Sequence, residues 1–233
     1  MKITKLQMLG LSAAMLVTVQ VATAQTCTAT SGRSAELLNV TGGAAFTPDS
    51  YTVSGRLGAA GQNAFGGARV VILTRDVDGR NAFAFGADFG WKIPLGIAKT
   101  VMLCPILDYS YQAGPNNNGP NQIIRLDSYH VLAPGMNIGR VVSINDNVAI
   151  LPFAGGSMQW LRYERREFGD RDKVYTRFVT ARAGFGVEFM RSWVIRTSIA
   201  TPVGVPSPQT SVAIAATVSF RGPRTVYPGQ QRK

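Results

Sequence analysis

Large apolar side chains alternate with small or polar ones along much of this chain. The alternation is clearest in three segments, at 80–92, 179–189 and 211–220. In the first segment, apolar residues occupy every second position from Phe83 to Trp91, with Ala, Gly and Asp residues between them. Successive side chains of a β-strand point to opposite faces, so this period of two predicts strands with one apolar face and one small or polar face.

The predicted strands are long. Soluble strands usually span about five or six residues, whereas a tilted membrane-spanning strand needs about 9–11. A second face of Gly, Ala, Thr and isolated charges suits a narrow polar lumen. We therefore predict an all-β protein, a closed antiparallel up-and-down transmembrane β-barrel of about ten strands, with about eight as the alternative. The expected strands lie near 37–46, 50–60, 65–75, 80–92, 99–112, 123–139, 147–163, 174–190, 192–203 and 210–220.

The N-terminus has the three-part pattern of a secretory signal peptide. Lys2 and Lys5 precede an apolar stretch at 6–21, and Ala22-Thr23-Ala24 supplies small residues for cleavage. A membrane anchor helix is the alternative, but the apolar stretch is short for a span of about 20 residues. The expected organisation is a signal peptide (1–24), an N-terminal periplasmic segment and possible plug (25–36), the barrel (37–220) and a basic disordered tail (221–233).

The connections and aromatic residues predict an orientation. The polar connections 113–122 and 164–173 are long and would face outward, while 61–64 and 190–192 are short and would face the periplasm, as is typical of outer-membrane barrels. Prolines at 134 and 152 suggest bulges or local breaks. The expected aromatic girdles are Trp91, Phe189, Trp193 and Phe220 at the periplasmic rim, and Phe46, Tyr51, Tyr109, Tyr111, Tyr163 and Tyr175 at the outer rim.

The charge balance is basic. The net charge is +11, and four of the basic residues lie in the last 13 residues. Export of the chain argues against nucleic acid as a partner and favours anionic surfaces. We expect contacts with outer-membrane lipid and lipopolysaccharide, the latter through the charged segment 164–173, and a contact of the basic tail with cell-wall polymer. A solvated loop and a solvated tail are the simpler alternatives.

The last predicted strand, SVAIAATVSF at 211–220, resembles the closing strand of bacterial outer-membrane β-barrel proteins. Val218 and Phe220 match the two apolar positions of that family's assembly signal, whereas Ala215 stands where Gly is common. The resemblance implies an outer-membrane location of the Gram-negative type and recognition by the barrel-assembly machinery. It transfers no substrate, because one barrel scaffold hosts many functions.

The two cysteines, Cys27 and Cys104, would be able to pair in an oxidising periplasm. Cys104 falls on the predicted lumenal face near the periplasmic rim, and Cys27 precedes the first strand. We expect a disulfide that ties the N-terminal segment into the barrel mouth, with two unpaired thiols as the alternative. Two Cys and one His without ligand spacing predict no metal site, and no motif predicts a cofactor.

Several charges fall on the predicted lumenal face. Buried opposite charges are expected to pair, because an unpaired buried charge is costly. The alternative is a pore that favours anions through the positive excess. The predicted lumenal charges are Arg56, Arg69, Asp88, Lys92, Asp108, Arg182, Glu188 and Arg196.

The single histidine, His130, shares a predicted strand face with Ser128, and Asp108 would lie on the neighbouring strand. A Ser/His/acid set is the minimum for nucleophilic catalysis, but no nucleophile elbow supports it. We therefore interpret His130 as a lumenal hydrogen-bonding residue and expect a non-enzymatic barrel with a structural, surface-interaction or narrow-channel role. The alternatives are a barrel hydrolase centred on His130 and a soluble secreted β-barrel that binds a small ligand.

Overall fold

The computed structural model describes Cys27 and residues 37–48, 50–61, 63–75, 81–95, 101–113, 124–167, 170–190, 192–205 and 208–221. These residues form strands and turns and contain no helix. The strands are β1 (Leu37–Thr47), β2 (Ser50–Ala60), β3 (Ala64–Arg75), β4 (Asn81–Trp91), β5 (Ile93–Leu95), β6 (Val101–Ala113), β7 (Ile124–Arg140), β8 (Val142–Ser143), β9 (Val148–Glu167), β10 (Asp170–Phe189), β11 (Trp193–Val203) and β12 (Ser211–Arg221).

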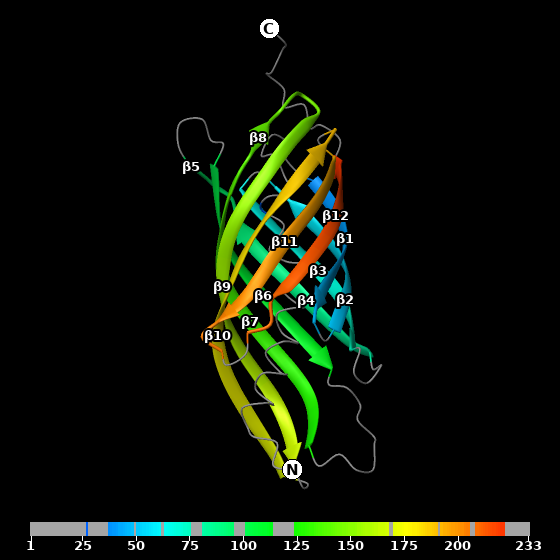
Figure 1. Cartoon of the computed structure of the whole chain (residues 1–233), viewed down its shortest axis with the longest axis vertical. Helices are drawn as coiled ribbons and strands as arrows, with labels where there is room; N and C mark the ends of the chain where they lie inside the picture. Colours follow the sequence, from blue (N-terminus) through cyan, green and yellow to red (C-terminus); the bar gives the residue numbers. More distant parts are fainter. Residues whose placement is uncertain are drawn as a thin grey trace.

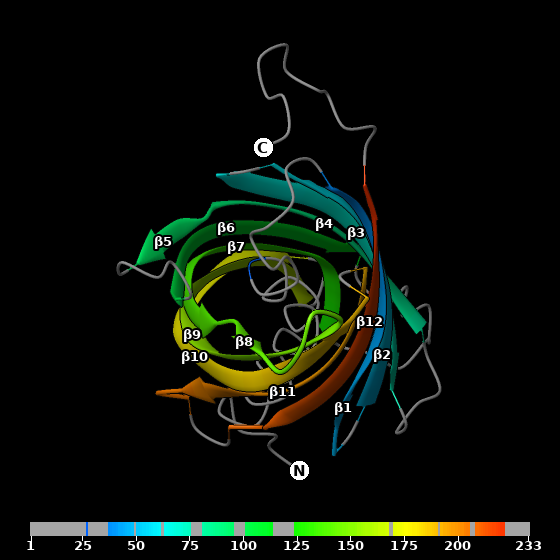
Figure 2. The same ribbon diagram turned by 90° about the horizontal axis from the view of Figure 1, so that it is seen from above.

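The strands form one closed antiparallel barrel (Figures 1 and 2). Each long strand pairs with its neighbours in chain order, and β12 closes the ring against β1 in a ladder from Leu37–Arg221 to Phe46–Val212. The short strands β5 and β8 continue β4 and β7 and pair with β6 and β9. The predicted ten-strand barrel is thereby confirmed, and the eight-strand alternative is wrong.

The barrel has two ends that differ. We call the end where β9 and β10 are joined the hairpin end, and the end where β1 begins and β12 finishes the terminal end. Figure 1 shows the hairpin end at the bottom of the view, where β9 and β10 reach well past β1, β2 and β12. Both strands are 20 residues long, against 11 for β1.

The length of β9 and β10 corrects one prediction. The segment 164–173 is not a loop, because β9 continues to Glu167 and β10 begins at Asp170. Hydrophobic alternation reports which face of a strand is buried, whereas the ladder bonds join backbone groups whatever the side chains are. Two paired strands therefore continue beyond the point where the apolar pattern ends.

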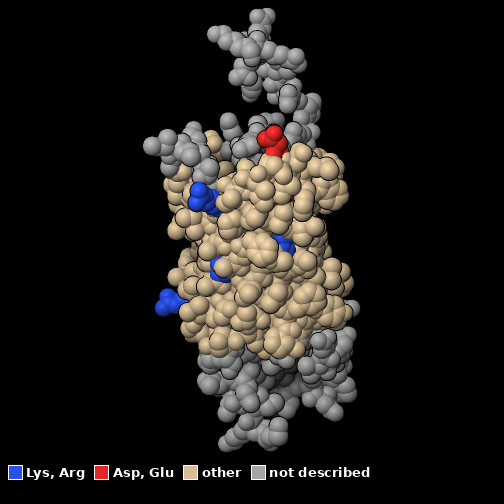
Figure 3. Space-filling view, turned by 45° about the horizontal axis from the view of Figure 1, so that its top comes forward, with Lys and Arg blue, Asp and Glu red and all other residues tan. Residues whose placement is uncertain are grey.

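The alternating residues face as the period of two predicts. Phe83, Phe85 and Phe185 are 51%, 54% and 53% exposed, whereas Ala82 and Ala84 are buried. Val218 is half-buried, and the residues on either side of it, Thr217 and Ser219, are buried. No second layer covers these outward side chains within the described residues. The face of the wall seen in Figure 3 is nearly all uncharged, with scattered charged groups.

The outward apolar residues form a band around the barrel. On β10 the band runs from Phe189 to Val179, which is ten residue steps along the strand. At about 3.3 Å per residue this is about 33 Å, or about 25 Å in height for a strand tilted by roughly 40°. The band on β12 runs in the same way from Phe220 to Val212.

One aromatic residue was placed on the wrong face. Tyr163 was expected in the outer-rim girdle, but it is buried and packs 5.8 Å from the ring of Tyr129. Even-numbered residues of β9 face outward, so Tyr163 points inward with Leu161. These residues and Phe178 form an apolar cluster on the inner wall near the hairpin end. The interior is therefore polar over part of its height and apolar at this end.

The two prolines interrupt the β7–β9 ladder without shifting it. The pairing stops at Pro134, between the Leu132–Trp160 and Gly135–Ser157 pairs, and resumes in the same register. It stops again opposite Pro152, where β7 gives way to β8. A proline has no backbone N–H to donate to the ladder, which accounts for a local break.

Candidate functional site in the barrel interior

The middle of the barrel interior holds two buried ion pairs. Arg56 on β2 donates from Nε and Nη2 to the two carboxylate oxygens of Asp88 on β4, both at 2.8 Å. Its Nη1 donates to Oδ1 of Asn39 at 2.7 Å. Arg69 on β3 makes the same bidentate contact with Asp108 on β6, both distances being 2.6 Å. All four charged side chains are at most 5% exposed.

Each of the two ion pairs joins strands that are separated by one intervening strand. Arg56 and Arg69 are direct cross-strand neighbours, and so are Asp88 and Asp108. Like charges directly opposite destabilise a sheet, so each guanidinium reaches over the intervening strand to a carboxylate. Gly67 leaves room for the reach of Arg56, since a Cβ there would lie 2.5 Å from Nη2.

The opposite wall carries two more arginines. Arg182 on β10 donates from Nε to Oδ1 of Asn137 at 2.9 Å, and it also interacts electrostatically with Asp108. Arg196 on β11 is fully buried and donates from Nη2 to Oγ1 of Thr217 at 2.6 Å. The partners Asn39, Asn137 and Thr217 were not singled out from the sequence, although small polar residues at inward positions were the available signal.

The structure places all eight predicted lumenal charges on the inner face. Seven are buried and Arg182 is half-buried. Four of them form the two ion pairs, and Arg182, Glu188, Arg196 and Lys92 lie outside those pairs. Among the inner-wall side chains that the structure describes, five are thus basic and three acidic, so the positive charges are in excess by two.

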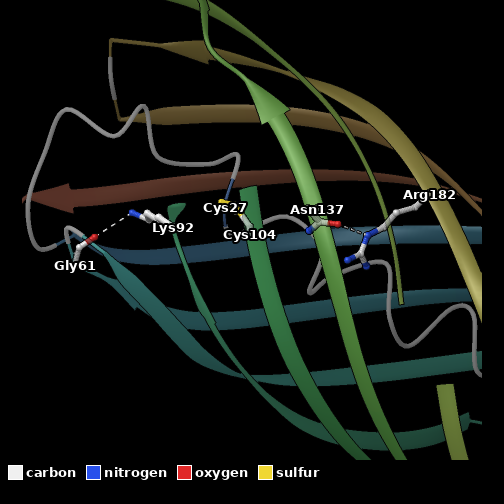
Figure 4. The surroundings of a disulfide bond; sticks show 6 residues. All are labelled: Cys27, Gly61, Lys92, Cys104, Asn137 and Arg182. Carbon is white, nitrogen blue, oxygen red and sulfur yellow. Dashed lines mark hydrogen bonds between the residues drawn. A yellow bond between two sulfur atoms is a disulfide. The ribbon is translucent and has the colours of Figure 1, made fainter. Parts of the chain in front are cut away.

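The disulfide joins the N-terminal segment to the barrel wall near the terminal end (Figure 4). Cys27 and Cys104 are bonded with their Cα atoms 6.0 Å apart, and both are 1% exposed. Phe65, Ile106 and the half-buried Met102 surround the bond. The disulfide is therefore present as predicted. The rest of the expected plug, the signal peptide and the basic tail lie outside the described residues, apart from Arg221 at the end of β12.

Lys92 follows the last residue of β4 at the terminal end. Its Nζ donates to the carbonyl oxygen of Gly61 at 3.1 Å (Figure 4). Its backbone N–H donates to the carbonyl oxygen of Asn63 at 2.7 Å. Both contacts hold the β2–β3 turn. Burial disfavours the ammonium form and lowers the pKa of Lys92 to about 8.

His130 does not lie in the lumen. It is half-exposed on the outer wall, where its Nδ1 is 2.9 Å from the hydroxyl of Tyr109. Asp108 points inward from the opposite face of the sheet. The structure therefore separates the candidate Ser128/His130/Asp108 set. In this part of β7 the inward face is apolar and the outward face is polar, because Tyr129 and Val131 are buried while His130 faces out.

The predicted assembly residues lie on the outer wall of the closing strand. Phe220 is 52% exposed and pairs with Leu38, and Val218 pairs with Val40 and with Trp193. They belong to the apolar band where β12 meets β1. Across the described residues, no cluster of three or more His, Cys, Asp or Glu side chains is arranged to hold a metal ion. In the same part of the chain, no helix is long and apolar enough to cross a membrane.

Comparison with known proteins relates this chain to others through its fold. No family model and no curated protein sequence matches it. The translocator domain of the autotransporter NalP from Neisseria meningitidis matches with a TM-score of 0.53 and 12% identity, over 93% of this chain and 100% of that chain. At this identity the match shows a shared β-barrel fold.

Two further solved structures have lower TM-scores. The β domain of the Bordetella autotransporter Brka has a TM-score of 0.42 and 12% identity, over 80% of this chain and 99% of that chain. The N-terminal β-barrel domain of OprF from Pseudomonas aeruginosa has a TM-score of 0.40 and 7% identity, over 80% and 98%. The neighbours are outer-membrane β-barrel proteins.

Proposed function

We propose that this protein is a non-enzymatic barrel of a Gram-negative type outer membrane, with a structural and surface-interaction role. The observation that carries the proposal is the outward apolar band, about 25 Å high, around a barrel with ion pairs inside it. Soluble monomers rarely expose contiguous apolar patches larger than a few hundred Å². A hydrocarbon environment accounts for the outward Phe and Val side chains, and the closed ladder leaves no unpaired edge in it.

The surface-interaction role rests on the hairpin end. On β10 the apolar band ends at Val179, and the strand continues for nine residues to Asp170. Paired strands that continue past the band form a rigid projection beyond the membrane surface. Such a projection suits contact with external molecules better than the short turn Gly61–Ala64 at the terminal end does.

The separation of Ser128 and His130 from Asp108 supports the non-enzymatic part of the proposal. The outward position of the apolar band argues against the soluble ligand-binding alternative. In the proposed orientation the terminal end faces the periplasm, and the assembly machinery would recognise the closing strand through Val218 and Phe220.

A narrow channel that favours anions is the second candidate. The excess of two positive charges on the inner wall supports it, since a lumen of that sign attracts anions. Single-channel recording in planar bilayers separates the two roles. A stable conductance with anion selectivity would favour the channel, and a silent bilayer would favour the structural and surface role.

Heat-modifiable migration tests the membrane assignment. The protein is expressed from its full 233-residue sequence. The envelope is then fractionated, and the detergent-extracted protein is run on gels with and without boiling. We expect it in the outer-membrane fraction, migrating differently before and after heating because a closed barrel resists the detergent until heated. A soluble periplasmic pool with one migration position would overturn the proposal.

A further inference from the structure

A row of aromatic and basic side chains crosses four strands on the outer wall. Tyr111 on β6 pairs with His130 on β7, His130 pairs with Arg162 on β9, and Arg162 pairs with Tyr175 on β10. Direct cross-strand partners point to the same face, and this face is the outer one, because Tyr175 is 70% exposed. The rings of Tyr111 and His130 lie 5.1 Å apart.

A second aromatic-basic pair lies next to this row, two residues nearer the terminal end on the same strands. Trp160 on β9 is the direct partner of Arg177 on β10. Trp160 is 47% exposed, and Arg177 is exposed as well. We call these six residues, Tyr111, His130, Arg162, Tyr175, Trp160 and Arg177, the rim patch.

The rim patch begins where the apolar band ends. On β10 the outward residues are apolar up to Val179, and the next outward residue is Arg177. On β9 the outward Met158 and Trp160 come directly before Arg162. In the proposed orientation this is the level of the lipid headgroups in the outer leaflet, where aromatic belts and basic side chains meet the polar part of the lipid.

The charge of this face favours an anion. Among the residues whose side chains the structure describes, the acidic ones are Asp88, Asp108 and Glu188 inside the barrel and Asp146 in the turn after β8 at the terminal end. The rim patch has two guanidinium groups on adjacent strands. Glu164, two residues beyond Arg162 on β9, is the direct cross-strand partner of Lys173 on β10, so an acidic and a basic residue face each other there. Guanidinium groups recognise phosphate oxygens by paired hydrogen bonds, and aromatic faces suit the rings of sugars.

We propose that the rim patch binds the phosphorylated headgroup of an outer-leaflet glycolipid, with Arg162 and Arg177 contacting the phosphate and Tyr175 and Trp160 packing on the sugar. This site rests on the proposed function, because it needs the band to lie in the membrane. The continuation of β9 and β10 above the patch places a rigid wall beside the headgroup rather than a loop.

The test uses the heat-modifiable, refolded protein in zwitterionic detergent micelles. Binding is measured for diphosphorylated lipid A and for the same lipid with both phosphates removed. We compare the native protein with the double variant Arg162→Gln/Arg177→Gln. The matched control is Arg140→Gln, which removes an exposed arginine at the terminal end of β7.

We expect the native protein and the control to bind the phosphorylated lipid and to bind the phosphate-free lipid much more weakly. One basic residue near an anionic membrane surface contributes about a factor of five to affinity, so the double variant should bind about 25-fold more weakly. Inorganic phosphate at millimolar concentration should not displace the lipid, because the site binds both the phosphate and the sugar of the headgroup.

Equal affinity for the two lipids would overturn the proposal, and so would an unchanged affinity of the double variant. Both results leave the membrane assignment standing, because only heat-modifiable protein enters the assay. A protein that never shows heat-modifiable migration overturns the proposed function instead. The variant's own heat-modifiable band shows that it folds, so weak binding is not a folding defect.

Discussion

Arg69 and Asp108 show how a charged side chain inside the barrel depends on its partner. Both are buried, and two hydrogen bonds of 2.6 Å join the guanidinium to the carboxylate. Removing one partner leaves an uncompensated buried charge, which typically costs about 3–5 kcal/mol. We expect Arg69→Met to lower the free energy of unfolding by about that amount, measured by urea unfolding in micelles. The double variant Arg69→Met/Asp108→Leu should lose less, and an equal or larger loss would contradict the ion-pair interpretation.

Lys92, at the terminal end, makes the free energy of unfolding depend on pH. Its pKa is lowered to about 8 in the folded protein, against 10.5 as the ordinary value. Between these values the unfolded chain binds more protons, so stability should rise as the pH increases from about 8 to 10.5. We expect Lys92→Met to remove this rise, measured as the difference in unfolding midpoint between pH 7.5 and pH 10.5. A rise of the same size in both proteins would show that another group is responsible.

At the residue scale, the sequence predicts which way a side chain points better than it predicts what it contacts. The period of two assigns Arg56 and Asp88 to the inner face, because alternation is local. Their pairing depends on β2, β3 and β4 lying side by side and on the space above Gly67, which appears only in three dimensions. His130 and Tyr163 were misplaced because polar and apolar residues exchange faces near the hairpin end.

The disulfide is the clearest feature at the scale of elements. It ties the segment before β1 to β6 across a sequence separation of 77 residues. Closing a loop of that size stabilises a fold by about 2–4 kcal/mol, mainly by restricting the unfolded chain. We expect Cys27→Ser/Cys104→Ser to form a heat-modifiable barrel whose free energy of unfolding is lower by about that amount. A reducing agent should lower the free energy of unfolding of the native protein to that of the variant, and it should leave the free energy of the variant unchanged. Failure of the variant to form the barrel would show that the bond is needed for folding.

The strands themselves were predictable to within a few residues, apart from the extension of β9 and β10. Alternation marks a strand where its two faces meet different surroundings, as between Phe83 and Trp91. Beyond the apolar band the outer face of β9 and β10 becomes polar while Tyr163 and Phe178 stay buried on the inner face, so the expected contrast is lost from the sequence although the pairing continues to Glu167 and Asp170. Tyr111 and Tyr175 were expected at the outer rim, but the rim patch as a set was not predictable, because its rows run across strands and not along them.

At the scale of the whole molecule, the band predicts how the cost of a charge depends on depth. Ala183 lies near the middle of the band on β10 and Val179 at its edge, and both side chains face outward. An arginine at the midplane of a bilayer costs about 2–4 kcal/mol in a barrel, and near the interface about 0–1 kcal/mol. We therefore expect Ala183→Arg to destabilise the protein folded in phospholipid vesicles far more than Val179→Arg does, measured as the free energy of unfolding in denaturant. On a water-exposed wall the two substitutions would each change stability by no more than about 0.5 kcal/mol. Equal, small effects at both positions would place this face in water and remove the basis of the membrane assignment, whereas a graded cost would locate the centre of the bilayer on β10.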